Sequence, residues 1–90
     1  MRVSKEIFKT VAQGNGVPAS GDLFEGVYNS ETYRAEFYLD GNFNKPQICL
    51  AADSIIEKKA EAGWERVDTE NLSDDDFNKL VNAITPVLEN

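Results

Sequence analysis

The sequence YRAEFYLD, residues 33–40, alternates apolar and polar side chains and decides the fold class of this chain. The apolar phase consists of Tyr33, Ala35, Phe37 and Leu39. Because successive side chains of a β-strand point to opposite faces of a sheet, the stretch predicts a strand with one buried face. Tyr38 falls on the polar phase beside charged residues, so we expect it to face solvent or a partner.

Two neighbouring segments predict further strands. Leu23–Tyr28 is expected to pair with the first strand across a turn at Asn29–Glu31, with a bulge accommodating Gly26. Residues 40–42 (DGN) carry strong turn chemistry. After them, residues 47–51 (QICLA) are either a third strand or part of the following helix. The result is a small antiparallel sheet of about three strands.

Capping signals predict a helix near each end of the sequence. Ser4 is a suitable N-cap, with Val3 and Phe8 placed as a hydrophobic staple. Ser73 caps the last helix, and the aspartates after it suit the positive end of the helix dipole. The apolar stripe of this helix comprises Phe77, Leu80, Val81, Ile84 and Leu88. Pro86 is expected to kink or fray its final turn.

A third helix is predicted in the middle of the chain. Ser54 and Glu57 have the spacing of a capping box, and Gly63 is the kind of residue that ends a helix. Residues 64–67 are expected to form a short extra strand. The predicted fold is therefore α+β, in the order helix, two or three strands, helix, short strand, helix. The helices are expected to pack on one face of the sheet.

The expected core draws on every predicted element. It comprises Phe8, Val11, Val27, Tyr33, Phe37, Leu39, Ile48, Leu50, Ile55, Trp64, Phe77, Leu80, Val81 and Ile84. With 90 residues, of which 41% are hydrophobic, the chain is long enough for one such core. Residues 1–90 are therefore predicted to form a single domain.

The net charge of −7 restricts the classes of partner. Lys and Arg supply the affinity for phosphate backbones and anionic membranes, so direct binding to nucleic acid or membrane is not expected. No stretch approaches the roughly 20 apolar residues that cross a bilayer. Met1–Thr10 has no apolar run, which argues against a secretory signal. Cys49 is the single cysteine, so no intramolecular disulfide is expected and a reducing cytoplasm is the natural setting.

The residues that usually carry catalysis are scarce. The chain has no histidine, the commonest general base and metal ligand. Cys49 lies in an apolar run, as a buried structural thiol would. Asp40, Asn42 and Asn44 have the first spacings of a calcium loop, but Lys45 stands where that loop requires glycine. We therefore expect no enzymatic activity, no cofactor and no metal ligand. A small enzyme or metal-binding module is the weakest alternative.

Acidic residues gather in the last third of the sequence. Residues 65–90 hold seven acids and two bases. The candidate partner-binding acids are Glu65, Asp68, Glu70, Asp74, Asp75 and Asp76. Such a row imitates phosphates and attracts a protein with a basic surface, although acidity also serves solubility. Inhibitors of nucleic-acid-handling enzymes, including small phage-encoded proteins and immunity proteins, share this size and acidity as a class. The leading hypothesis is a non-catalytic acidic protein-binding module, an inhibitor or adaptor.

Aromatic residues supply a second set of candidates. Tyr28, Tyr38 and Phe43 lie near charged residues, as aromatic residues in protein-binding hot spots do. Filling the sheet is the other explanation for them, since strands favour aromatic side chains. A second functional hypothesis follows: a structural or assembly protein that forms a homo-oligomer through its sheet edge or the Tyr38 face.

Overall fold

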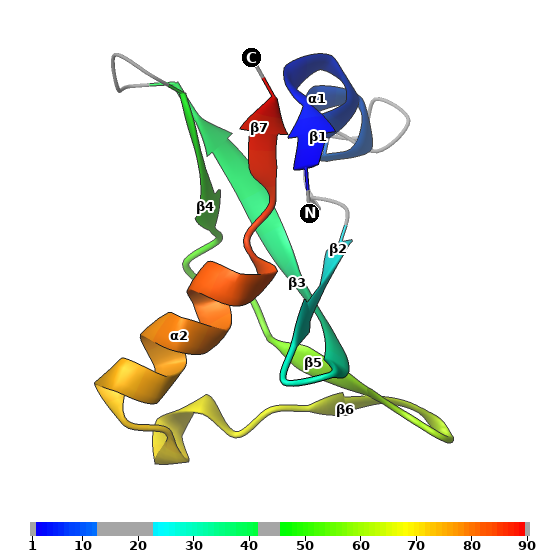
Figure 1. The fold of residues 1–90 in the computed structure, drawn as a ribbon, viewed down its shortest axis with the longest axis vertical. Coiled ribbons are helices and arrows are strands. Elements are labelled where there is room, and N and C mark those ends of the chain that lie inside the picture. Colours follow the sequence, from blue (N-terminus) through cyan, green and yellow to red (C-terminus); the bar gives the residue numbers. More distant parts are fainter. Residues whose placement is uncertain (1, 13–22, 42–45, 90) are drawn as a thin grey trace.

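The computed structural model describes residues 2–12, 23–41 and 46–89 of the chain. Within them the order is β1 (Arg2–Ser4), α1 (Lys5–Ala12), β2 (Leu23–Tyr28), β3 (Glu31–Asp40), β4 (Gln47–Leu50), β5 (Glu57–Ala60), β6 (Gly63–Arg66), the 3₁₀ turn η1 (Thr69–Asn71), α2 (Asp74–Ile84) and β7 (Val87–Glu89) (Figure 1). The mixed α+β class with an antiparallel sheet is confirmed, but the order differs and the strands outnumber the prediction.

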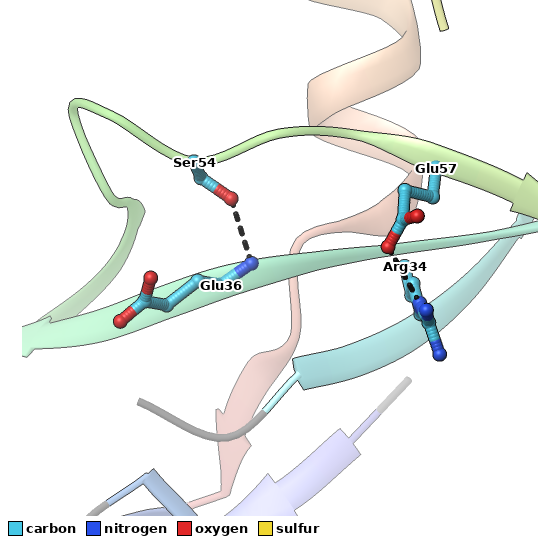
Figure 2. A network of polar contacts seen from close by, with 4 residues as sticks. All are labelled: Arg34, Glu36, Ser54 and Glu57. Carbon is cyan, nitrogen blue, oxygen red and sulfur yellow. Dashed lines mark hydrogen bonds and ion pairs between the residues drawn. The ribbon is translucent and has the colours of Figure 1, made fainter. Parts of the chain in front are cut away.

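Strand β3 forms the centre of a five-stranded antiparallel sheet. β2 pairs along one of its edges in an unbroken register that includes Gly26, so the predicted bulge is absent there. β4 and β5 lie end to end along its other edge, and β6 pairs with β5. Between β4 and β5 the Ser54 hydroxyl accepts a hydrogen bond from the Glu36 backbone N–H at 2.8 Å (Figure 2). This bond satisfies a strand donor that no neighbouring strand reaches.

The helix predicted from Ser54 to Gly63 is wrong: most of this segment is a β-hairpin. Glu57–Ala60 pairs with β3 and then turns back into β6 at Gly63, whose φ of 136° favours glycine. The short strand predicted at residues 64–67 is observed as β6, and residues 47–50 are a strand. Tertiary pairing with β3 therefore overrides the local capping-box signal.

The two predicted terminal helices are confirmed, with their caps. The Ser4 hydroxyl accepts from the Ile7 N–H at 3.1 Å, and the Ser73 hydroxyl accepts from the Asp76 N–H at 3.1 Å. α2 ends at Ile84, earlier than the predicted stripe, which included Leu88. The chain instead continues into β7, which pairs in parallel with β1 and joins residues near the two ends of the sequence (Figure 1).

Both helices pack on the same face of the five-stranded sheet. The Phe8 ring of α1 stacks on Phe24 of β2, with ring centroids 4.9 Å apart, and α2 approaches β2 at Gly26. The buried core comprises Phe8, Phe24, Ala35, Phe37, Ile56, Leu80 and Ile84. Three predicted core residues are wrong. Val27 and Trp64 lie on the opposite face of the sheet from Phe24, and Ile55 is exposed whereas Ile56 is buried. Neither helix of the described chain has the length and apolar character needed to cross a membrane.

Candidate functional site

A groove lies between α2 and the end of the β5–β6 hairpin. It consists of three adjoining hollows of about 320, 290 and 250 Å³, and Val67 lines all three. Tyr33 lines two of the hollows, as does Asp68. The remaining lining residues are Tyr28, Asn29, Lys58, Glu65, Arg66, Thr69, Glu70, Leu72, Asp76 and Leu80. We call this feature the acidic groove.

Two tyrosines from the β2–β3 hairpin contribute aromatic surface to the groove. Tyr28 closes a two-residue turn, in which Asn29 and Ser30 both have positive φ (51° and 64°) as type I′ hairpin turns require. The Tyr33 hydroxyl donates a hydrogen bond to Glu31 Oε2 at 3.3 Å. Burial, together with the Glu31 carboxylate, raises the pKa of the Tyr33 phenol. Tyr33 therefore stays neutral at physiological pH.

Helix α2 and the turn before it form the opposite wall. Asp76 and Leu80 are four residues apart and lie on one side of α2, and Leu72 of the preceding turn lines the same hollow. Leu80 is buried against the sheet. The backbone of Asp76 is fixed by the Ser73 cap, while its side chain remains exposed. The carboxylate of Asp76 therefore lies at the rim, beside the apolar part of the groove.

The groove carries more negative than positive charge. Four of its lining side chains are acids: Glu65, Asp68, Glu70 and Asp76. The bases among the lining residues are Lys58 and Arg66. Lys58 Nζ lies 3.6 Å from Glu31 Oε1, so its charge is partly compensated within the chain. The groove therefore has a negative potential that favours a cationic occupant.

Five of the candidate partner-binding residues come together here. They are Tyr28, Glu65, Asp68, Glu70 and Asp76. Asp74 and Asp75 are exposed in the first turn of α2 and do not line the groove, and Asp75 Oδ2 pairs with Lys79 Nζ at 3.0 Å. Phe43 lies outside the described residues.

Tyr38 lies on the opposite face of the sheet from Tyr33, because the two differ in phase along β3. Its predicted exposure is confirmed at 47%. The Cys49 thiol, directly opposite on β4, raises the pKa of the Tyr38 phenol. Tyr33 was expected in the core, and neither Val67 nor Leu72 was a predicted site residue. The alternation of residues 33–40 predicts that Tyr33 lies on the same face of the sheet as Ala35. It does not predict the hollows that Tyr33 lines.

Within residues 2–12, 23–41 and 46–89, no three His, Cys, Asp or Glu side chains are grouped so that they could hold a metal ion. Asn42 and Asn44 of the calcium-like spacing lie outside these ranges. The chain matches no family model, no curated protein and no solved structure. Function is therefore inferred from the shape and charge of the groove.

Proposed function

We propose that this protein is a non-catalytic binding module, an inhibitor or adaptor, that seats a basic segment of a partner protein in the acidic groove. One observation carries the proposal. Candidate residues from β2, β6, η1 and α2, up to 48 positions apart in the sequence, line three hollows that all share Val67. A binding site requires residues to converge in this way, whereas charge that only keeps a protein soluble does not.

The lining suits the two parts of a lysine or arginine side chain. The apolar stem can lie along Val67, Leu72 and the tyrosine rings, while the cationic head reaches the carboxylates at the rim. Tyr28 and Tyr33 add cation–π attraction. Charge-assisted hydrogen bonds to Asp68 or Asp76 would be stronger than neutral ones. A partner with a basic surface, such as a nucleic-acid-handling enzyme, fits this chemistry.

Charge reversal inside the groove should slow association with the partner. We expect the double variant Glu70→Lys/Asp76→Lys to lower the association rate by about tenfold or more at low salt, because electrostatic steering depends on the local potential. The partner is first captured from a lysate with the wild-type chain at low salt. Association of the purified pair is then followed by surface plasmon resonance.

A matched control separates the groove from the net charge. Asp74→Lys/Asp75→Lys introduces the same change of charge in the first turn of α2, next to Asp76 but outside the groove. It should leave the association rate close to that of the wild type. Equal slowing by both double variants would mean that only net charge matters, and no slowing by either would remove the groove from binding. Circular dichroism melts of both variants establish that they remain folded.

A further inference from the structure

Exposed hydrophobic side chains and paired charges lie on the face of the five-stranded sheet opposite the helices. We call this face the open face. Strand phase places Leu23, Val27, Tyr38 and Trp64 on it, opposite the core side chains such as Phe24 and Phe37. Three of these are large hydrophobic residues with high exposure: Val27 at 61%, Tyr38 at 47% and Leu23 at 46%. Neither described helix covers this face.

A row of alternating charges crosses the open face at one level. Register pairs Glu25 of β2 with Arg34 of β3, Arg34 with Glu57 of β5, and Glu57 with Arg66 of β6. Directly paired residues of antiparallel strands project from the same face. The row therefore reads negative, positive, negative, positive from β2 to β6.

The middle of this row is held in place. Arg34 Nε donates to Glu57 Oε1 at 2.9 Å, and both side chains are only 27% exposed (Figure 2). The Arg34 guanidinium also lies over the Trp64 ring, 4.2 Å from its centroid. Cation–π stacking and the ion pair fix the two central charges, which leaves Glu25 and Arg66 as the outer members of the row.

The charges of this row are complementary to those of the same row in a second copy, when the second row runs in the opposite order. A twofold axis parallel to the strands, passing between β3 and β5, lays the row of a second copy over the first in the opposite order. Glu25 of each copy then faces Arg66 of the other, and Arg34 faces Glu57. The same rotation brings the exposed Val27 of one copy over Trp64 of the other, because each residue lies two positions from the row, in the same direction along the strands.

The charge balance of the open face also favours a second copy. Its acids are Glu25, Glu36, Asp40 and Glu57, and its bases are Arg34, Lys59 and Arg66. The face is thus close to neutral, while the chain as a whole carries a net charge of −7. Two acidic molecules repel each other least when they approach through their most neutral surfaces.

We infer that two copies of this chain associate face to face through the open face, with the Glu25–Arg34–Glu57–Arg66 rows opposed. The acidic groove is lined mainly from the helix side of the sheet, by residues such as Tyr33, Lys58 and Glu65, and it shares Arg66 with the open face. Each copy in the dimer therefore keeps most of its groove outward. The inference does not depend on the proposed function, and Glu25, which does not line the groove, tests it independently of Arg66.

Sedimentation equilibrium over a dilution series tests the inference, with the emission of Trp64, the single tryptophan, as a second readout. The wild type should form a dimer as concentration rises. Glu25→Arg and Arg66→Glu should each weaken the dimer by about tenfold or more, because each places like charges opposite one another. Glu6→Arg on α1 changes the charge equally on the helical side and should leave the dimer unchanged.

Mixing the two weakened variants is the decisive step. A Glu25→Arg chain and an Arg66→Glu chain have complementary outer charges, so their mixture should dimerise at concentrations at which each variant alone is mainly monomeric. The double variant Glu25→Arg/Arg66→Glu should also dimerise with itself. A wild type that stays monomeric at every concentration, a dimer that survives both single changes, or a mixture that remains monomeric would each overturn the inference.

Discussion

Replacing Gly26 with alanine should lower the free energy of unfolding by about 3 kcal/mol, at the upper end of what overpacking usually costs. A Cβ at this position would lie 2.6 Å from Ile84 Cα and 2.9 Å from the Ile84 carbonyl oxygen. These are backbone atoms at the end of α2, so no rotation of a side chain relieves the clash. The helix must move away from β2, which separates the buried Ile84 from the core.

Gly41→Ala is the matched control for this prediction. A Cβ at Gly41 meets nothing within 4 Å. The substitution should therefore change stability by no more than about 0.5 kcal/mol. Urea denaturation of both variants measures the difference. Equal stability of the two variants would show that α2 does not approach β2 as closely as described.

Phe8→Ala should cost about 3–5 kcal/mol, the usual range for truncating a buried phenylalanine. Phe8 is fully buried and stacks on Phe24, so it is the main apolar anchor of α1 on the sheet. Domains of this kind have a total stability of about 5–15 kcal/mol, so the variant should lose a large share of its stability.

The neighbouring residue of α1 provides the comparison. Ile7 is 56% exposed, and Ile7→Ala should cost less than about 1 kcal/mol. The two variants are compared by urea denaturation followed by circular dichroism. Similar losses in both would place α1 on the sheet through a different side than the structure shows.

Local signals in the sequence were sufficient where local interactions decide the structure. The period of two in residues 33–40 predicted β3, and Ser4 and Ser73 cap the helices that they were expected to cap. The capping-box spacing of Ser54 and Glu57 predicted a helix wrongly, because both side chains bind residues of β3 instead. Ser54 accepts from the backbone of Glu36, and Glu57 pairs with Arg34. Partners 18 and 23 residues away are not visible in a short stretch of sequence.

The candidate site was predictable in composition but not in arrangement. The acidic bias of residues 65–90 supplied most of the candidate residues, and Asp76 was among them. Its position across the groove from Tyr28 depends on the approach of α2 to β2 at Gly26, a contact between distant parts of the chain. Asp74 and Asp75 have the same sequence environment as Asp76, and only the helical phase separates them from the groove.

Changes in backbone amide chemical shifts locate the surface on which a cationic peptide binds. The ¹⁵N-labelled chain is titrated with a short peptide of alternating arginine and alanine, and with the same peptide carrying glutamate in place of arginine. We expect the arginine peptide to shift the amides of Tyr28, Val67, Leu72 and Asp76, and these shifts to disappear in Glu70→Lys/Asp76→Lys. Shifts concentrated at Asp74 and Asp75 or on the open face, or none with the arginine peptide, would contradict it.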